Sequence, residues 1–260
     1  PLLGARIPNQ NLHGMPSVDY VIYAPNEFLP AAEDLADLHR ARGLKVAVVD
    51  VAQAYREFSG GVQDLMGLRN LLRMLWSRPA DSTKLQYLLL FGDASYDYKG
   101  RLTPKQNWVP AYQSPSSMSI KTSFVSDDVY GYLDPGEGAN LAASTLDLGI
   151  GRIPVNSLDQ ARGVVAKIRR YADPQQSMGP WRQRVQFVAD DVDEDWEQIL
   201  TLVADRIAER VDTQHAEFDV RKLFSDAYAQ VSSAGNQSYP KLREDLLRSV
   251  NEGNLITTYI

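Results

Sequence analysis

Up to Asp173 the chain alternates between short apolar runs and stretches in which apolar residues recur every three or four positions. An apolar run bounded by turn residues predicts a strand buried on both faces, and the wider spacing predicts an amphipathic helix. The predicted strands are residues 19–24, 44–51 and 85–91, and the helices between them are 29–42 and 65–77. This β-α-β-α-β order predicts right-handed crossovers and a parallel sheet.

After the third strand the pattern is less regular. Residues 94–125 form a long polar connection, which in a compact domain indicates a functional or mobile loop. Two further strands, 124–134 and 146–154, are predicted to pair as a hairpin at the edge of the sheet. Ser157 and Gln160 form a capping box, so a helix is predicted to begin there.

The segment Asp173–Pro180 is rich in turn-forming residues, and after it the alternation of strands and helices restarts. The predicted elements are strands at 185–191, 220–224 and 254–260 and helices at 194–211 and 240–253. Four apolar side chains of the first helix are predicted to face inward, namely Ile199, Leu202, Val203 and Ile207. The whole chain is thus predicted to be α/β.

The domain organisation follows from these elements. Residues 1–17 are predicted to be a linker or a strand of a preceding domain, 18–173 a first subdomain, 174–181 a linker and 182–260 part of a second subdomain. The last predicted strand has no following element to cover it, and about three strands make a small sheet. We therefore expect a piece of a longer protein, with the second subdomain truncated.

Composition narrows the classes of partner. A net charge of -6 and a pI of about 5.1 argue against nucleic acid or an anionic membrane as the main partner, because phosphate charges would repel the protein. No apolar run is long enough to predict a transmembrane segment. The 260 residues include no cysteine, so they supply no disulfide, no thiolate ligand and no cysteine nucleophile.

Common nucleotide and hydrolase motifs are missing. Gly149 and Gly151 match two glycines of a dinucleotide fingerprint, but Pro154 follows where the helix should already have begun. This weakens the alternative of a Rossmann-like nucleotide domain, and the sequence contains no P-loop. The three histidines fall in a linker, a helix and a loop and are expected at the surface; they are His13, His39 and His215.

Acidic pairs are the main candidates for chemistry. They fall at predicted strand ends or on the long connection, as Asp93/Asp97, Asp127/Asp128 and Asp190/Asp191. Parallel sheets bind ligands at the carboxyl ends of their strands, so the pairs could converge there. Converged carboxylates could bind Ca²⁺, orient a catalytic histidine or receive a basic substrate side chain. Alternatively, each carboxylate caps its own turn and the pairs never meet. The candidate metal ligands are Asp93, Asp97, Asp190 and Asp191.

Several short motifs occur in a fixed order along essentially the whole chain. They are Asn9-Gln10-Asn11-Leu12-His13-Gly14, Glu57-Phe58-Ser59-Gly60-Gly61 with Asp64, Leu90-Phe91-Gly92-Asp93 with Tyr96-Asp97-Tyr98, Ser126-Asp127-Asp128, Ile150-Gly151-Arg152-Ile153-Pro154, and Trp181 before Val188-Ala189-Asp190-Asp191. This ordered set resembles the gingipain family of cysteine peptidases, in particular the members that act as sortases of the bacterial type IX secretion system.

The resemblance implies a caspase-like fold of two adjacent, mostly parallel, three-layer subdomains. Such enzymes cleave a peptide bond with a thiolate paired to a histidine, and the sortases then join the secreted protein to a surface glycolipid. In the family the histidine follows a strand like 254–260 within Gly-His-Gly, and the cysteine follows the next strand. Both are expected after Ile260, so the chain has no catalytic residue and is expected to be inactive.

The resemblance also bears on site residues and partners. Asp127 is similar to an aspartate associated with the substrate pocket, and Asp93, Asp127 and Asp128 are expected to line the cleft. No cofactor is required, although Ca²⁺ could bind. The implied partners are C-terminal signal domains of secreted proteins and other type IX secretion components, at the outer membrane or cell surface of a Gram-negative bacterium. The alternative is a non-catalytic α/β binding module for a secreted partner or a small ligand.

Overall fold

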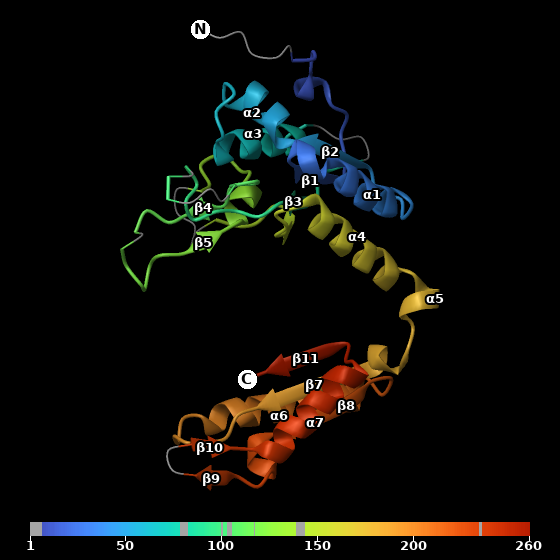
Figure 1. Ribbon diagram of the computed structural model, residues 1–260, viewed down its shortest axis with the longest axis vertical. Coiled ribbons are helices and arrows are strands. Elements are labelled where there is room, and N and C mark those ends of the chain that lie inside the picture. Colours follow the sequence, from blue (N-terminus) through green and yellow to red (C-terminus); the bar gives the residue numbers. More distant parts are fainter. Residues whose placement is uncertain are drawn as a thin grey trace. The chain divides into compact units, whose positions relative to one another are not determined.

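The structure is a computed structural model that describes residues 7–78, 83–99, 101–102, 106–116, 118–138, 144–233 and 236–260. The chain divides into two compact units, Pro1–Ala172 and Asp173–Ile260 (Figure 1). Each unit has a parallel sheet of its own with helices packed on it. No helix among the described residues combines the length and apolarity needed to cross a membrane.

The main sheet of the first unit contains β1 (Tyr20–Ala24), β2 (Val46–Asp50), β3 (Tyr87–Phe91) and β6 (Gly149–Ile153). Their order across the sheet is β2-β1-β3-β6, and every neighbouring pair is parallel. The predicted α/β fold with parallel sheets is confirmed. β1 and β3 lie inside the sheet and are buried along nearly their whole length, as their continuous apolar sequences require.

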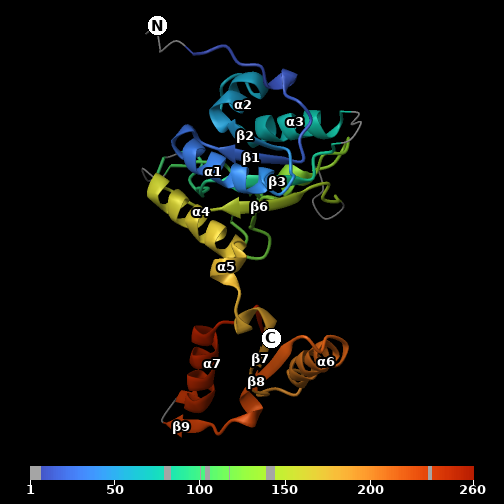
Figure 2. The ribbon, with the colours of Figure 1, turned by 90° about the vertical axis from the view of Figure 1, so that its right-hand side faces the viewer.

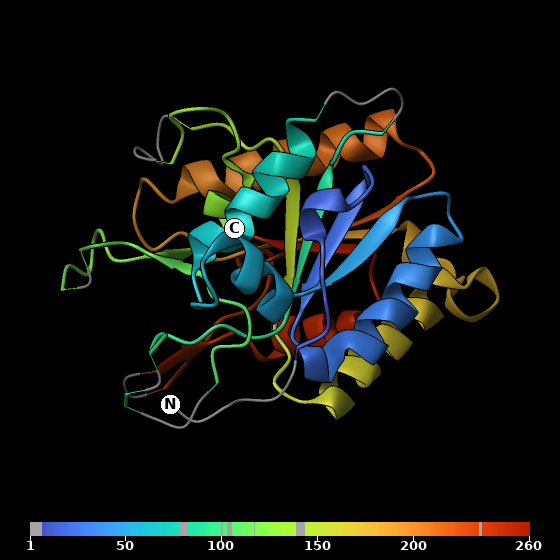
Figure 3. The same cartoon turned by 90° about the horizontal axis from the view of Figure 1, so that it is seen from above.

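Helices cover both faces of this sheet (Figures 2 and 3). α1 (Leu29–Arg40) and α4 (Leu158–Ala172) lie side by side on one face. α2 (Val51–Phe58) and α3 (Leu65–Trp76) pack together on the other. The sheet therefore separates two apolar cores, one under each helix pair.

Alternate residues of β1 supply the two cores, because successive side chains of a strand point to opposite faces. Ile22 belongs to the core under α1 and α4, whereas Tyr23 belongs to the core under α2 and α3. The Tyr23 ring is fully buried, and its hydroxyl donates to the carbonyl of Leu68 at 2.7 Å. Burial is therefore accompanied by a hydrogen bond, which a buried hydroxyl needs.

The second unit has the sheet order β11-β7-β8, with parallel pairs throughout. These strands are β7 (Arg184–Ala189), β8 (Asp219–Phe224) and β11 (Ile256–Tyr259). α6 (Gln198–Gln214) and α7 (Pro240–Glu252) lie on opposite faces of this sheet (Figure 2). Shorter elements of the chain are α5 (Pro174–Ser177), the antiparallel pair β4 (Tyr112–Gln113) and β5 (Val125–Ser126), and the hairpin of β9 (Val231–Ser233) and β10 (Asn236–Ser238).

Helix α2 occupies a region in which the glycine pair Gly60–Gly61 suggests that no helix forms. Asp50 ends β2 and caps the helix, since its Oδ1 accepts a hydrogen bond from the Ala52 amide at 3.0 Å. The helix continues to Phe58, and both glycines follow it with positive φ. The pair ends the helix instead of preventing it, because the glycines lie beyond its last turn.

The predicted hairpin between residues 124–134 and 146–154 is wrong. β6 pairs in parallel with β3, and β5 pairs with β4 instead. Residues Asp128–Gly131 form a 3-10 turn, followed by further buried residues. Four side chains of this segment are buried without the alternation of a strand, namely Val129, Tyr130, Tyr132 and Leu133. The predicted hairpin at the sheet edge would have one solvent-exposed face and would expose every second residue, which burial of these neighbouring side chains contradicts.

The predicted inner face of α6 is also wrong. The buried residues of this helix are Ala204 and Ala208. Small side chains there let the helix approach the sheet closely, and Lys222 of β8 reaches Asp205 at 2.8 Å. The four larger apolar side chains are 41–60% exposed; they are Ile199, Leu202, Val203 and Ile207.

Candidate active site

The carboxyl ends of β7 and β11 meet at one edge of the second unit's sheet. β7 is followed directly by Asp190 and Asp191, and β11 runs beside it in parallel as far as Tyr259. The Ile260 amide donates to the Val188 carbonyl at 3.0 Å, so the pairing extends to the last residue. This edge is where an open parallel sheet places its ligands.

Asp190 is held by two donors at this edge. Its Oδ2 accepts the Tyr259 hydroxyl at 2.8 Å, and its Oδ1 accepts the Asp191 amide at 3.1 Å. The Tyr259 hydrogen bond is the largest cause of a lowered pKa for Asp190, because it stabilises the ionised carboxylate. Asp190 is therefore a fixed anion at neutral pH.

Asp191 has its own tyrosine. Tyr239 directly precedes α7, and its hydroxyl donates to Asp191 Oδ2 at 2.8 Å. This hydrogen bond is the main cause that raises the pKa of Tyr239 to about 12. Gln230 Nε2 lies 3.5 Å from the same carboxylate oxygen. Two tyrosines from different elements thus orient two adjacent aspartates.

A cavity of about 220 Å³ opens at this edge. Four of the residues that line it are acidic, namely Asp190, Asp191, Asp193 and Glu197; the others are Leu200, Thr201, Tyr259 and Ile260. Glu197 Oε2 accepts from the amides of Asp193 and Glu194, each at 2.9 Å, and so stabilises the turn before α6. The concentration of negative charge suits a cationic group or a hydrogen-bond donor.

In the first unit, Asp127 forms a two-point ion pair with Arg152 of β6. Arg152 Nε lies 2.8 Å from Asp127 Oδ2, and Nη2 lies 2.7 Å from Oδ1. Arg152 Nη1 also donates to the carbonyls of Gly92 at 2.7 Å and Val109 at 2.9 Å. Both oxygens of Asp127 are therefore already bonded within the fold.

The other three predicted site residues of the first unit, Asp93, Asp97 and Asp128, form local hydrogen bonds. Asp93 Oδ1 accepts from the Ala94 amide at 2.9 Å, and Asp97 Oδ2 accepts from the Leu102 amide. The Asp128 amide donates to Ser126 Oγ at 3.0 Å. Arg152 brings the Asp127 carboxylate near the chain around Asp93. That Asp93, Asp127 and Asp128 line a substrate cleft stays a prediction.

The predicted metal ligands are divided between the units, with Asp93 and Asp97 in one and Asp190 and Asp191 in the other. Among the described residues, the group of three acidic side chains with oxygens within 4.8 Å of one another is a different one, Asp134, Glu137 and Asp147. Two of these carboxylates already accept backbone amides, since Asp147 Oδ2 accepts from Leu133 at 2.9 Å and Glu137 Oε1 accepts from Thr145 at 3.0 Å. Calcium binding by the four predicted aspartates stays a prediction.

Three contributors to these arrangements were not singled out from the sequence, namely Tyr239, Tyr259 and Arg152. Tyr259 could have been found, because a tyrosine at the end of a strand parallel to one ending in Asp-Asp can reach that pair. Arg152 stands inside one of the ordered motifs, so its position was known but its partner was not. Nothing in the sequence around Tyr239 indicates a bond to a residue 48 positions away.

Comparison with known proteins identifies the family. The sequence profile of peptidase family C25 matches residues 14–260. No curated protein matches the chain. Among solved structures, the dimeric latent PorU of Porphyromonas gingivalis is 33% identical with a TM-score of 0.58, over 68% of this chain and 17% of the PorU chain.

A second solved structure is the complex of pro- and mature domains of RgpB from Porphyromonas gingivalis. It is 17% identical with a TM-score of 0.56, over 92% of this chain and 47% of that chain, and at this identity it shows the fold alone. The chain thus spans less than half the length of either solved protein. The family profile covers nearly the whole sequence and confirms the resemblance drawn from the motifs, so the chain belongs to peptidase family C25, the gingipain family of cysteine peptidases.

Proposed function

We propose that the chain is part of a cysteine endopeptidase of the sortase type. It would cleave C-terminal signals from proteins of the type IX secretion system. It would then transfer the shortened proteins to a surface glycolipid. The observation that carries the proposal is the edge at which β11 ends beside Asp190 and Asp191. The identity of 33% with PorU over 68% of the chain supports the choice of this branch of the family.

The geometry of that edge suits a catalytic histidine. In the family the histidine is expected directly after a strand like β11, and β11 ends beside the Asp190 carboxylate. A carboxylate at this place can accept a hydrogen bond from an imidazole and stabilise the imidazolium. Tyr259 and Tyr239 hold the two aspartates in position by hydrogen bonds.

The 260 residues would not cleave peptides on their own, because they include no cysteine. In the proposed reaction a thiolate attacks the scissile carbonyl, the amine leaves with a proton from the imidazolium, and a thioester remains. An amine on the glycolipid then attacks the thioester and regenerates the thiolate. Water in place of the amine gives simple hydrolysis.

The proposed setting is the cell surface of a Gram-negative bacterium, and the proposed partners are C-terminal signal domains and other type IX components. The test uses the protein encoded by the whole gene, a peptide carrying a C-terminal signal, and a soluble primary amine. Mass spectrometry should show a product whose new C-terminus is an amide of the added amine. A free carboxylic acid alone would leave a peptidase and overturn the sortase assignment. No cleavage would favour a binding module.

A further inference from the structure

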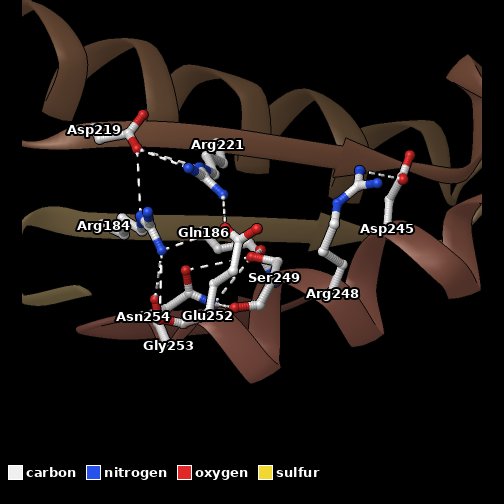
Figure 4. Close-up of polar contacts among 10 residues, drawn as sticks. All are labelled: Arg184, Gln186, Asp219, Arg221, Asp245, Arg248, Ser249, Glu252, Gly253 and Asn254. Carbon is white, nitrogen blue, oxygen red and sulfur yellow. Dashed lines mark hydrogen bonds and ion pairs between the residues drawn. The ribbon is translucent and has the colours of Figure 1, made fainter. Parts of the chain in front are cut away.

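A second cavity lies in the second unit, under α7 and away from the carboxyl edge of the sheet. It has a volume of about 310 Å³ and lies between α7 and strands β7 and β8 (Figure 4). Its lining includes Gln186 of β7, Arg221 of β8, and Asp245, Arg248 and Ser249 of α7. We call it the α7 pocket. It is separate from the residues used in the proposed function.

The amide of Gln186 is incompletely bonded in this pocket. Gln186 is fully buried, and no acceptor among the described residues reaches its Nε2. Its Oε1 accepts a hydrogen bond from Ser249 Oγ. A buried amide donor without an acceptor is costly, so such groups call for a specific explanation.

The orientation of the amide follows from its neighbours. Asn254 Nδ2 donates to Ser249 Oγ at 3.2 Å and lies 3.3 Å from the Ser249 carbonyl. The hydrogen of the Ser249 hydroxyl goes to Gln186 Oε1, which is much closer than the other acceptor, Asn254 Oδ1 at 3.4 Å. The amide nitrogen of Gln186 is left facing the pocket with two hydrogens to donate.

Two arginines of the pocket lining, Arg221 and Arg248, accompany this donor. Gln186 and Arg221 are paired across β7 and β8, so both side chains point to the α7 face. Two acids hold Arg221 in the pocket wall, because its Nη1 lies 3.3 Å from Glu252 Oε2 and its Nη2 lies 3.2 Å from Asp219 Oδ2. Lys222 points to the opposite face, where it binds Asp205 of α6.

Arg248 can turn to a ligand without leaving an unpaired acid. It binds Asp245 at 2.5 Å and is 59% exposed. Asp245 has a second cation, because Lys241 Nζ lies 3.2 Å from its Oδ1. Arg248 is thus an exposed positive charge in the lining of a pocket that also contains an unsatisfied amide donor.

We propose that the α7 pocket binds a small oxyanion, either a carboxylate or a phosphate group. Gln186 Nε2 donates to one ligand oxygen and Arg248 binds another, while Arg221, held by Asp219 and Glu252, forms part of the wall. Charge-assisted bonds of this kind are the stronger ones in proteins. The proposal accounts for the buried donor and for the exposed arginine beside it.

The test measures the melting temperature of the protein against inorganic phosphate and against acetate, with chloride at equal ionic strength. A bound ligand raises the melting temperature in a saturable way, whereas a general salt effect acts equally on all variants. Gln186→Leu removes the donor at similar volume and leaves Ser249 bonded to Asn254. We expect it to fold with an unchanged or higher melting temperature and to lose the saturable response.

A second pair of variants changes residues of α7 outside the buried core. Arg248→Gln should weaken the response by about tenfold in apparent dissociation constant, as expected for one lost charge-assisted bond. Arg243→Gln removes the same charge from α7 outside the pocket and should respond as the unaltered protein does. Saturation by phosphate alone identifies a phosphate site, and saturation by acetate a carboxylate site. The proposal would be overturned if phosphate and acetate raised the melting temperature no more than chloride, or if Arg248→Gln responded as the unaltered protein does. In either case a water molecule would be the expected partner of the Gln186 amide.

Discussion

The guanidinium of Arg152 donates to both carboxylate oxygens of Asp127 and to the carbonyl of Gly92. Three of the motifs that define the family resemblance therefore meet at one side chain. They are the Ser126-Asp127-Asp128 motif, the Leu90-Phe91-Gly92-Asp93 motif and the Ile150-Gly151-Arg152 motif. In this chain the three motifs form one polar cluster. The cluster connects the loops at the carboxyl edge of the first unit's sheet.

Replacing this arginine should destabilise the protein. The side chains of Arg152 and Asp127 are only 14% and 24% exposed, so Arg152→Met leaves a mostly buried carboxylate unpaired. We expect a loss of about 2–4 kcal/mol in unfolding free energy, measured by urea denaturation. Adding Asp127→Asn should recover part of it, because the unpaired charge is removed. A loss below about 0.5 kcal/mol would show that the cluster has no structural role.

Glu57 fastens the segment before β1 to helix α2. It accepts the Leu12 amide at 2.8 Å, Gln10 Nε2 at 2.9 Å and His13 Nδ1 at 2.8 Å. Desolvation alone would raise the pKa of Glu57, but the hydrogen bonds from Leu12, His13 and Gln10 outweigh it and lower the pKa to about 2.

The lowered pKa predicts a pH dependence of stability. The ionised carboxylate stabilises the fold above the ordinary pKa of about 4.5, and this contribution is lost as the pH falls toward 2. The difference in unfolding midpoint between the unaltered protein and Glu57→Gln should therefore be largest near pH 6 and shrink toward pH 2. The exposed Glu27→Gln serves as the control. A difference that is constant across this range would contradict the assigned hydrogen bonds.

Tyr259 should control the ionisation of Asp190. Tyr259→Phe removes the hydrogen bond that is the main cause of the lowered pKa, so the pKa of Asp190 should rise toward its ordinary value. Carbon-13 NMR of the Asp190 carboxyl during an acid titration measures this directly. Tyr239→Phe is the matched control, because Tyr239 bonds Asp191 and should move the Asp190 midpoint less. Equal shifts in both variants would contradict the pairing.

Gly92 is placed where a side chain would collide. A Cβ atom there would lie 2.9 Å from Trp108 Cβ and 3.1 Å from Val109 Cγ2. Gly92→Ala should lower the unfolding free energy by about 1–3 kcal/mol through overpacking. Gly151→Ala is the control, since its nearest neighbour would be Leu89 Cδ1 at 3.9 Å. Similar melting temperatures for the two variants would mean that the loop after β3 yields readily.

Much of the fold could be predicted because the sequences of the central strands are continuously apolar, which indicates that these strands are buried. Residues 19–24 and 85–91 have continuous apolar runs, and they form the parallel pair β1 and β3. The hairpin error arose where burial depends on distant partners. Tyr130 is fully buried and its hydroxyl donates to the Pro110 carbonyl at 2.6 Å, a contact that no local sequence pattern indicates.

The candidate site was predictable in place but not in detail. Asp190 and Asp191 follow a strand end, which assigns them to the carboxyl edge of a parallel sheet. Tyr259 could be inferred from the parallel strand that it ends, but Tyr239 could not, since it lies 48 positions from Asp191 outside any predicted strand. The prediction for the inner face of α6 is wrong for a similar reason. Ala204 and Ala208 are buried against the sheet, and helix periodicity alone does not indicate how closely the helix and the sheet pack.

The most direct test of the account compares peptide cleavage by the 260-residue chain and by the product of the whole gene, with and without a thiol-alkylating reagent. We expect no cleavage by the cysteine-free chain, and we expect alkylation to abolish the cleavage by the whole product. Cleavage by the 260 residues alone, or by the alkylated whole product, would contradict the account.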